Sequence, residues 1–397
     1  MQPELKVTVG AERMILCDGL QPFMIATPKG TVFVQAQLSF PPGYVPPPEN
    51  AYPGIPGNVI SRDGGKTWSL WRYKPKHDEA DELKSGTGGY WDSVTTTAQV
   101  GPTFEGSAVG LRDGSVLILD WIARGPDEQG YFEGTLWESH DDLETVVGPT
   151  PWRVHLPQAK AGNDDGGHPF RAICMHRTVL EMPDGNLLST AYGWFKGDDT
   201  PSTYRPVMSK FRSILLRSSD RGRSWHFVST IAVDPEIGEE GFNEPVMARV
   251  SHGPNVGRLI CHIRTGSNDC PIYQVISDDD GATWTAPQAL PFNGVDPDLI
   301  ETSDGILIGI IGRRINEEFS PDRCYQLIGS TDAGENWTLL ATWNTEPYSN
   351  VDSTTYYAAL REVAPGRVLV AYDVGWWGQP IRYVAGREVQ VELRHSS

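Results

Sequence analysis

One eight-residue pattern, Ser-x-Asp-x-Gly-x-x-Trp, occurs four times in this chain and constrains its fold more than any other feature. The intact copies are Ser61–Trp68, Ser218–Trp225, Ser277–Trp284 and Ser330–Trp337, and a degenerate copy from Ser139 keeps only the Ser and the Asp. The aspartate accepts backbone N–H bonds within a hairpin turn, the glycine allows positive φ, and the tryptophan packs beside the turn. Successive copies lie 53 to 79 residues apart, which is typical of repeated β-sheet units. The repeat therefore predicts a turn-rich all-β protein.

The pattern resembles the Asp-box (BNR) repeat of the sialidase, or neuraminidase, superfamily, and the resemblance extends over nearly the whole chain. It implies an all-β fold, a six-bladed β-propeller with Asp-box hairpin turns, formed as a single domain over residues 1–397. Six units of four antiparallel strands are expected, with first turns at Gly30, Gly114, Gly185, Gly253 or Gly257, Gly305 and Gly366. We expect Glu4–Val9 to pair with Glu388–Glu392, because closing the ring of blades removes exposed sheet edges.

Composition excludes several classes of partner. Lys and Arg total 33 against 51 Asp and Glu, so the net charge of −18 disfavours nucleic acid and anionic membrane surfaces. No stretch approaches the roughly 20 apolar residues of a membrane helix.

No signal peptide is visible and the five cysteines are scattered, which favours a cytoplasmic location, although a secreted chain trimmed of its signal would look the same. No metal-ligand spacing or phosphate-binding glycine motif occurs, so we expect no metal and no cofactor. The oligomeric state stays open.

The expected topology places polar side chains at a common centre, on the face opposite to the Asp-boxes. Counting nine residues back from each first turn gives the inner-strand starts: Gln21, Glu105, His176, Glu244, Asp296 and Tyr357. Counting seven forward gives the ends of the second strands: Gln37, Trp121, Tyr192, Arg264, Gly312 with Arg313 beside it, and Asp373. Polar groups that converge on an axis predict a ligand site. The alternative is a solvated channel lined by polar residues.

The resemblance also implies a catalytic apparatus. Sialidases use a tyrosine nucleophile activated by a glutamate, and three arginines bind the carboxylate of the substrate. Asn243-Glu244-Pro245, followed by Arg264, resembles the glutamate strand and its arginine. Tyr357 begins a Tyr-x-x-Leu segment that resembles the nucleophile strand, and it is followed by Asp373 where the family usually has a Glu. Arg323 resembles the third arginine, and Arg313 is its rival.

The first unit departs from the family pattern at two positions. The segment Gln21–Ala26 lacks the arginine of the family's Phe-Arg-Ile-Pro motif, and Leu38–Gly57 lacks the acid/base aspartate and contains only Glu49. Other units would have to supply these groups. Arg171 or Arg177 could complete the carboxylate site. The candidate proton donors are His176, Glu105, Asp92 and Glu49.

These observations predict a sialidase-like exo-glycoside hydrolase that removes a terminal, carboxylated sugar from a glycan. Tyr357 would attack the anomeric carbon, Glu244 would serve as its base, and the arginines would hold the carboxylate. The missing arginine of the first unit leaves a polysaccharide lyase or a non-sialic glycosidase open, because an arginine-rich site with a Tyr and a His also suits uronate elimination. A non-catalytic glycan-binding propeller is the third alternative.

Overall fold

The structure is a computed structural model that describes residues 4–38, 55–71, 107–315, 322–344, 354–376 and 381–394. These residues form strands, turns and irregular connections without a helix, so the prediction of an all-β chain is confirmed for the described part. Three sheets have four strands each. The first comprises β3 (Leu20–Ala26), β4 (Val32–Leu38), β5 (Ile55–Ser61) and β6 (Ser69–Leu70). The second comprises β19 (Asn243–Arg249), β20 (Leu259–Arg264), β21 (Pro271–Ser277) and β22 (Gln288–Asn293). The third comprises β23 (Val295–Glu301), β24 (Leu307–Arg313), β25 (Cys324–Ser330) and β26 (Thr338–Trp343).

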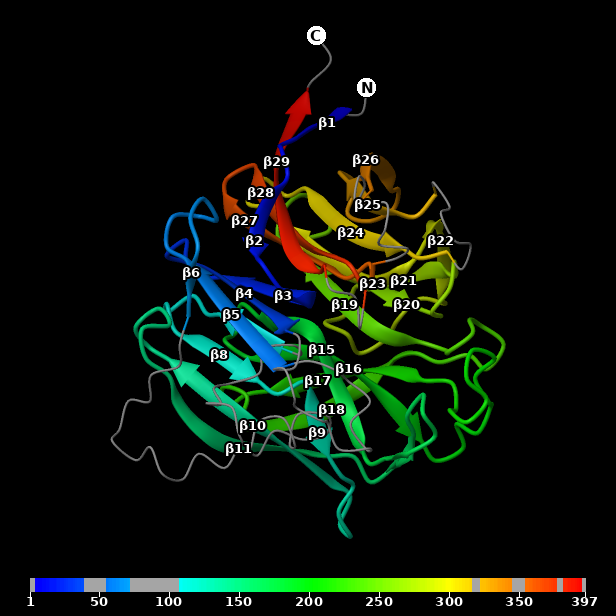
Figure 1. Cartoon of the computed structure of the whole chain (residues 1–397). Coiled ribbons are helices and arrows are strands. Elements are labelled where there is room, and N and C mark those ends of the chain that lie inside the picture. The colour runs from blue at the N-terminus through cyan, green and yellow to red at the C-terminus, as the bar shows by residue number, and fades with distance from the viewer. Residues whose placement is uncertain are drawn as a thin grey trace.

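The terminal segments of the chain share a five-stranded sheet. Its strands are β27 (Ala358–Ala364), β28 (Arg367–Val374), β29 (Tyr383–Arg394), β1 (Glu4–Val9) and β2 (Arg13–Leu16). β1 pairs antiparallel with β29, from Glu4 opposite Arg394 to Val9 opposite Val389. Both termini therefore lie at the same end of the molecule, where blue β1 lies beside red β29 (Figure 1). The expected pairing of the two terminal strands is present.

The largest sheet contradicts the prediction of six four-stranded blades. It has ten strands: β7 (Ser107–Gly110), β8 (Val116–Leu119), β9 (Ile122–Arg124), β10 (Tyr131–Ser139), β11 (Val147–His155), β12 (Ala159–Lys160), β15 (Ala172–Glu181), β16 (Leu187–Phe195), β17 (Arg212–Ser218) and β18 (Ser224–Ala232). The short strand β9 pairs with both β10 and β15, and β11 pairs parallel with β18. Hydrogen bonding therefore runs through the boundary at which two separate blades were expected. The described strands form several sheets of unequal size, and the six-bladed assignment was wrong. A separate two-stranded hairpin consists of β13 (Gly162–Asn163) and β14 (Pro169–Phe170).

The first strands of these sheets surround a common centre. β3, β7, β15, β19, β23 and β27 contact one another in this order, and β27 contacts β3 again. Four of them carry a register shift, near the beginning of β3, β19 and β23 and in the middle of β15. Each shift contains a residue with φ between 45 and 51°: Gln21, Arg177, Glu244 and Asp296. A bulge of this kind bends the strand and re-aims a side chain. The repeated bulge therefore determines which side chains of these strands point toward the common centre.

The Asp-box turns have the hydrogen bonds that their sequence predicts. In the second copy, the Ser218 hydroxyl donates to Asp220 at 2.8 Å and accepts from the Gly222 amide at 2.8 Å. Asp220 also accepts from the amide and the hydroxyl of Ser224, at 2.8 and 2.6 Å. Burial raises the pKa of Asp220, but these hydrogen bonds outweigh it and lower the pKa below its usual value. The turns close hairpins, and the Asp-box residues described lie outside the cavity considered below.

We expect the substitution Asp220→Ala to lower the free energy of unfolding by about 1–2 kcal/mol, because three donors lose their acceptor at an exposed turn. Urea unfolding followed by tryptophan fluorescence measures the change. Asp280→Asn is the matched control, since Asp280 is an exposed Asp-box residue whose side chain has no hydrogen bond to the described part of the chain. Equal unfolding midpoints for Asp220→Ala and the wild type would contradict the role assigned to this turn.

Candidate functional site

A cavity of about 390 Å³ opens where the first strands meet, which is within the size range of small-molecule sites. Several groups predicted to converge line it: Gln21, His176, Arg177, Glu244, Arg264 and Tyr357. Glu244 lies in β19 and Arg264 ends β20, and the pairing of Asn243 with Arg264 places the two side chains together. Tyr357 directly precedes β27. Three separate strands thus deliver the groups at the centre of this cavity.

The central contact joins a phenol, a carboxylate and a guanidinium. The Tyr357 hydroxyl donates to Glu244 Oε1 at 2.6 Å. Arg264 Nη1 donates to the same Oε1 at 2.6 Å and to the Tyr357 hydroxyl at 3.0 Å. Burial raises the pKa of Glu244, but Arg264 and the hydrogen bonds outweigh it and lower the pKa to about 2. Glu244 is therefore ionised at neutral pH, although its residue is only 7% exposed.

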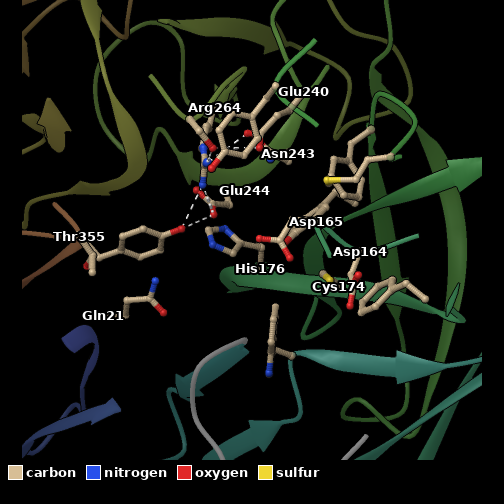
Figure 2. A pocket seen from close by; sticks show the side chains of 18 of the residues that line it. Gln21, Asp164, Asp165, Cys174, His176, Glu240, Asn243, Glu244, Arg264 and Thr355 are labelled. Carbon is tan, nitrogen blue, oxygen red and sulfur yellow. Dashed lines mark hydrogen bonds and ion pairs between the residues drawn. The ribbon is translucent and has the colours of Figure 1, made fainter. Parts of the chain in front are cut away.

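Arg264 is held by more than one carboxylate. Its Nη2 lies 3.1 Å from Glu240 Oε2 and donates to the Ser267 hydroxyl at 2.6 Å, and Ser267 in turn donates to Glu240 at 3.0 Å. Figure 2 shows Arg264, Glu240, Asn243 and Glu244 clustered on one side of the cavity. Neither Glu240 nor Ser267 was anticipated from the sequence, although Glu240 precedes the Asn-Glu-Pro segment by only a few residues. The position of a buried guanidinium between two carboxylates is fixed, because a move away from either carboxylate would leave a buried charge without a counter-ion.

A second buried ion pair supports the tyrosine from the other side. Arg177 Nη2 lies 2.7 Å from Asp296 Oδ2, and Arg177 Nη1 donates to the Ala358 carbonyl at 2.7 Å. The Arg177 guanidinium carbon lies 5.9 Å from the centre of the Tyr357 ring. Asp296 does not line the cavity but lies behind Arg177, and burial raises its pKa despite the guanidinium. Arg177 and Asp296 therefore position Tyr357 through its ring and the next residue in the chain.

His176 is uncharged in this setting. Burial lowers the pKa of His176 to about 4, although Glu244 opposes this shift. Its Nδ1 donates to the Pro245 carbonyl at 3.3 Å, so the neutral ring has no proton on Nε2, which lies 3.7 Å from Asp296. At neutral pH Arg264, and not His176, is the cation that keeps Glu244 ionised.

Asp373 lies beneath the segment that carries Tyr357 instead of lining the cavity. It accepts hydrogen bonds from the hydroxyls of Thr354 and Thr355, from the Tyr356 amide at 3.1 Å and from the Gln21 amide at 2.9 Å. Burial raises its pKa, and the hydroxyl donors oppose this shift. The carboxyl joins the segment before β27 to the start of β3. Asp373 is thus a positioning residue for Tyr357.

Three arginines predicted to bind substrate lie elsewhere. Arg313 pairs with Asp269 at 3.0 Å, and Arg323 donates to the Ile315 carbonyl at 2.7 Å. Arg171 donates to the Pro126 carbonyl and lines a separate pocket with Arg124 and Arg153. None of the three lines the central cavity. Glu105, Asp92 and Glu49 lie outside the described residues.

Arg314 lines the cavity in place of Arg313. The difference of one position matters because successive side chains along an extended chain point to opposite faces. Arg314 Nη2 donates to the Thr355 carbonyl at 2.6 Å, and its guanidinium lies 5.5 Å from the Trp376 ring. The sequence signal was the pair of adjacent arginines at the end of β24, but the sequence does not show which of the two faces the cavity.

The remaining wall of the cavity is largely aromatic, and of its members only Trp121 and Tyr192 were predicted from the sequence. Its side chains come from β14, β16, the residue before β9 and the segment between β16 and β17: Trp121, Phe170, Tyr192, Trp194, Tyr204, Met208 and Phe211. Trp194 stacks on Phe211 with ring centres 4.5 Å apart, and Tyr192 meets Phe211 edge to face. Across from Glu244, this wall carries Asp164 and Asp165 (Figure 2). Apolar surface with a few fixed polar groups is typical of pockets for small organic ligands.

Two other kinds of feature are absent from the described residues. No group of three or more His, Cys, Asp or Glu side chains there is arranged to hold a metal ion. In the same part of the chain, no helix is long and apolar enough to cross a membrane.

Comparisons with known proteins agree with the Asp-box interpretation. A family model described as BNR/Asp-box repeat matches residues 59–70, which include the first Asp-box. No curated protein matches the sequence.

Solved structures share the fold at low sequence identity. A protein of unknown function from Dyadobacter fermentans has a TM-score of 0.63 and 19% identity, and the alignment covers 97% of this chain and 99% of that one. An alpha-L-arabinanase from Penicillium chrysogenum, complexed with arabinobiose, has a TM-score of 0.58, 16% identity and coverages of 96% and 98%. A sialidase from Trypanosoma rangeli, in complex with the inhibitor DANA, has a TM-score of 0.51, 11% identity and coverages of 94% and 55%. The chain therefore shares the fold of these three proteins.

We expect Asp373→Asn to lower the free energy of unfolding by about 2–4 kcal/mol, because the NH2 group that replaces one oxygen of the buried carboxylate is a donor and cannot accept the hydrogen bonds which that oxygen accepts. Chemical denaturation measures this change. The control is Asp304→Asn, an exposed turn position, for which the unfolding midpoint should stay unchanged. A similar midpoint for both variants would refute the positioning role of Asp373.

Proposed function

We propose that this protein is an exo-acting glycoside hydrolase of the sialidase type, in which Tyr357 attacks the anomeric carbon of a terminal carboxylated sugar. The contact of the Tyr357 hydroxyl with Glu244 at 2.6 Å and with Arg264 at 3.0 Å carries this proposal. A phenol is a weak nucleophile until a neighbouring base takes its proton. The shared fold with an arabinanase and a sialidase supports a sugar as the substrate.

The Tyr357–Glu244 pair can move a proton without changing its total charge. Glu244 Oε1 accepts from both Tyr357 and Arg264, whereas Oε2 is buried and has no hydrogen bond partner in the described part of the chain. The carboxylate is thus placed as a base behind the phenol. When the phenol proton passes to Glu244, the negative charge moves to Tyr357, which Arg264 also contacts. The same guanidinium therefore stabilises the charge on either oxygen.

Arg314 is the guanidinium placed to bind a substrate carboxylate. Arg264 and Arg177 are paired with carboxylates of the protein, but Arg314 has no acidic partner within the described ranges, and its buried Nε lacks a hydrogen bond acceptor there. A guanidinium matches a carboxylate through two parallel hydrogen bonds. A neutral phenol as the nucleophile avoids the repulsion that a carboxylate nucleophile would exert on such a substrate.

A neutral-sugar glycosidase is the second candidate, and the charge balance of the cavity favours it. Asp164, Asp165, Glu240 and Glu244 line the cavity together with Arg177, Arg264 and Arg314, so carboxylates outnumber guanidiniums. The Penicillium arabinanase of the same fold was solved with arabinobiose. The aromatic wall suits the apolar face of either class of sugar.

We expect Tyr357→Phe to lower kcat by at least about 10²-fold on the substrate that the wild type hydrolyses, because the attacking oxygen is removed while the ring stays packed. The test is a panel of aryl glycosides, including an aryl α-sialoside and an aryl α-L-arabinofuranoside, with uronate polymers beside them. The control is Tyr273→Phe, a half-buried tyrosine outside the cavity, which should keep wild-type activity.

Each other result of the panel points to a different function. Hydrolysis of only the neutral glycosides selects the second candidate. Absorbance of an unsaturated uronate, with no hydrolysis, indicates a lyase, and glycan binding with no turnover indicates a binding protein. Unchanged kcat in Tyr357→Phe would exclude the tyrosine as the nucleophile.

We expect kcat/KM to lack an acid limb between pH 5 and 7. Glu244, with a pKa lowered to about 2, stays ionised when the pH falls over this range, and His176, with a pKa lowered to about 4, stays neutral. The measurement is the pH profile of the wild type beside that of His176→Gln. An inflection near pH 6.5 that disappears in His176→Gln would contradict this assignment.

A further inference from the structure

Hydrolysis as proposed above needs a proton for the departing oxygen, and the groups around Tyr357 do not supply one. Glu244 is ionised and lies behind the phenol, and the neutral ring of His176 carries its proton on Nδ1, bound to the Pro245 carbonyl. Asp164 accepts from the amides of Gly166 and His168, at 3.0 and 2.8 Å, and serves to hold a turn. The donor must therefore come from another part of the cavity wall.

The hairpin β13–β14 is fixed against that wall. Gly162 pairs with Phe170 and Asn163 with Pro169, and the Asp164 amide donates to the His168 carbonyl at 2.9 Å. The Asn163 amide group donates to the Val207 carbonyl at 2.9 Å. Gly162 lies so close to Trp194 that an added Cβ would be 2.5 Å from the indole ring. The five-residue loop at the tip of this hairpin is thus placed by backbone contacts.

Asp165 lies at the tip of this hairpin and lines the cavity. In Figure 2 its carboxyl group points inward, with His176 between it and Glu244. The residue is exposed, and its carboxyl has no hydrogen bond or ion pair with the described part of the chain. The loop thus holds the backbone of Asp165 while its side chain stays available to a ligand.

We propose that Asp165 is the general acid/base of this site. In the first step Tyr357 passes its phenol proton to Glu244 and its oxygen forms a bond to the anomeric carbon, while the bond from that carbon to the glycosidic oxygen breaks and the Asp165 carboxyl gives its proton to that oxygen. In the second step a water attacks the same carbon, Asp165 takes one proton from the water, and the bond to Tyr357 breaks. Tyr357 recovers its proton from Glu244. Both steps balance with the released alcohol and the free sugar as the only products.

The dependence on the leaving group tests this role, which rests on the proposed hydrolase function. The probes are the 2,4-dinitrophenyl and 4-methoxyphenyl glycosides of the sugar that the panel identifies. For Asp165→Ala we expect kcat/KM to fall by about 10²–10⁴-fold on the methoxyphenyl glycoside, whose leaving group needs a proton, and by less than about tenfold on the dinitrophenyl glycoside, whose leaving group does not. Added azide should speed breakdown of the glycosyl intermediate in Asp165→Ala and give a glycosyl azide, since a small anion needs no base. Asp280→Asn is the control and should behave as the wild type on both probes.

The outcomes separate the two proposals. An equal loss on both glycosides, or no loss on either, overturns the role of Asp165 and leaves the hydrolase function in place. Asp165→Asn, which keeps the size of the side chain, is measured beside Asp165→Ala, and wild-type activity in the folded Asn variant also overturns it. A wild-type protein that hydrolyses no glycoside overturns the hydrolase function and the role of Asp165 together.

Discussion

The site depends on a local backbone constraint, a residue in the left-handed conformation within four of the first strands. Gln21, Arg177, Glu244 and Asp296 all have positive φ without being glycines, and such a residue costs roughly 1 kcal/mol or more. The ion pairs of Glu244 with Arg264 and of Asp296 with Arg177 act on the same residues and oppose this cost. The contacts that place the candidate catalytic groups therefore also maintain the bulges that aim them.

Charge compensation then divides the site into fixed and available groups. Arg264 is held between Glu240 and Glu244, and Arg177 is held by Asp296, so these guanidiniums serve mainly to position Tyr357 and to stabilise charge on it. Arg314 and Asp165 have no such partner within the described ranges, and both line the cavity. The cavity thus contains one guanidinium and one carboxyl that the protein leaves available to a ligand, together with the preorganised Tyr357 hydroxyl.

The fold was predictable where the relevant interactions are local. The Asp-box turns follow from eight residues in sequence, because Ser218, Asp220 and Gly222 bond to one another within the turn. The number and size of the sheets do not follow from the sequence in this way. β9 joins β10 to β15, and β11 pairs with β18, so the ten-stranded sheet depends on contacts between distant segments that no turn pattern records.

The sequence by itself determined the all-β class, the hairpin turns and the three residues at the centre of the site, Glu244, Arg264 and Tyr357. Counting residues along each strand from its hairpin turn was enough to place these three at the same end of their sheets. Only the tertiary structure decided which of the other arginines and carboxyls face the cavity. Arg314 replaces Arg313 because a shift of one residue reverses the direction of an extended side chain. Asp165 reaches the cavity because its hairpin packs on Trp194, a contact between surfaces that residue spacing does not encode.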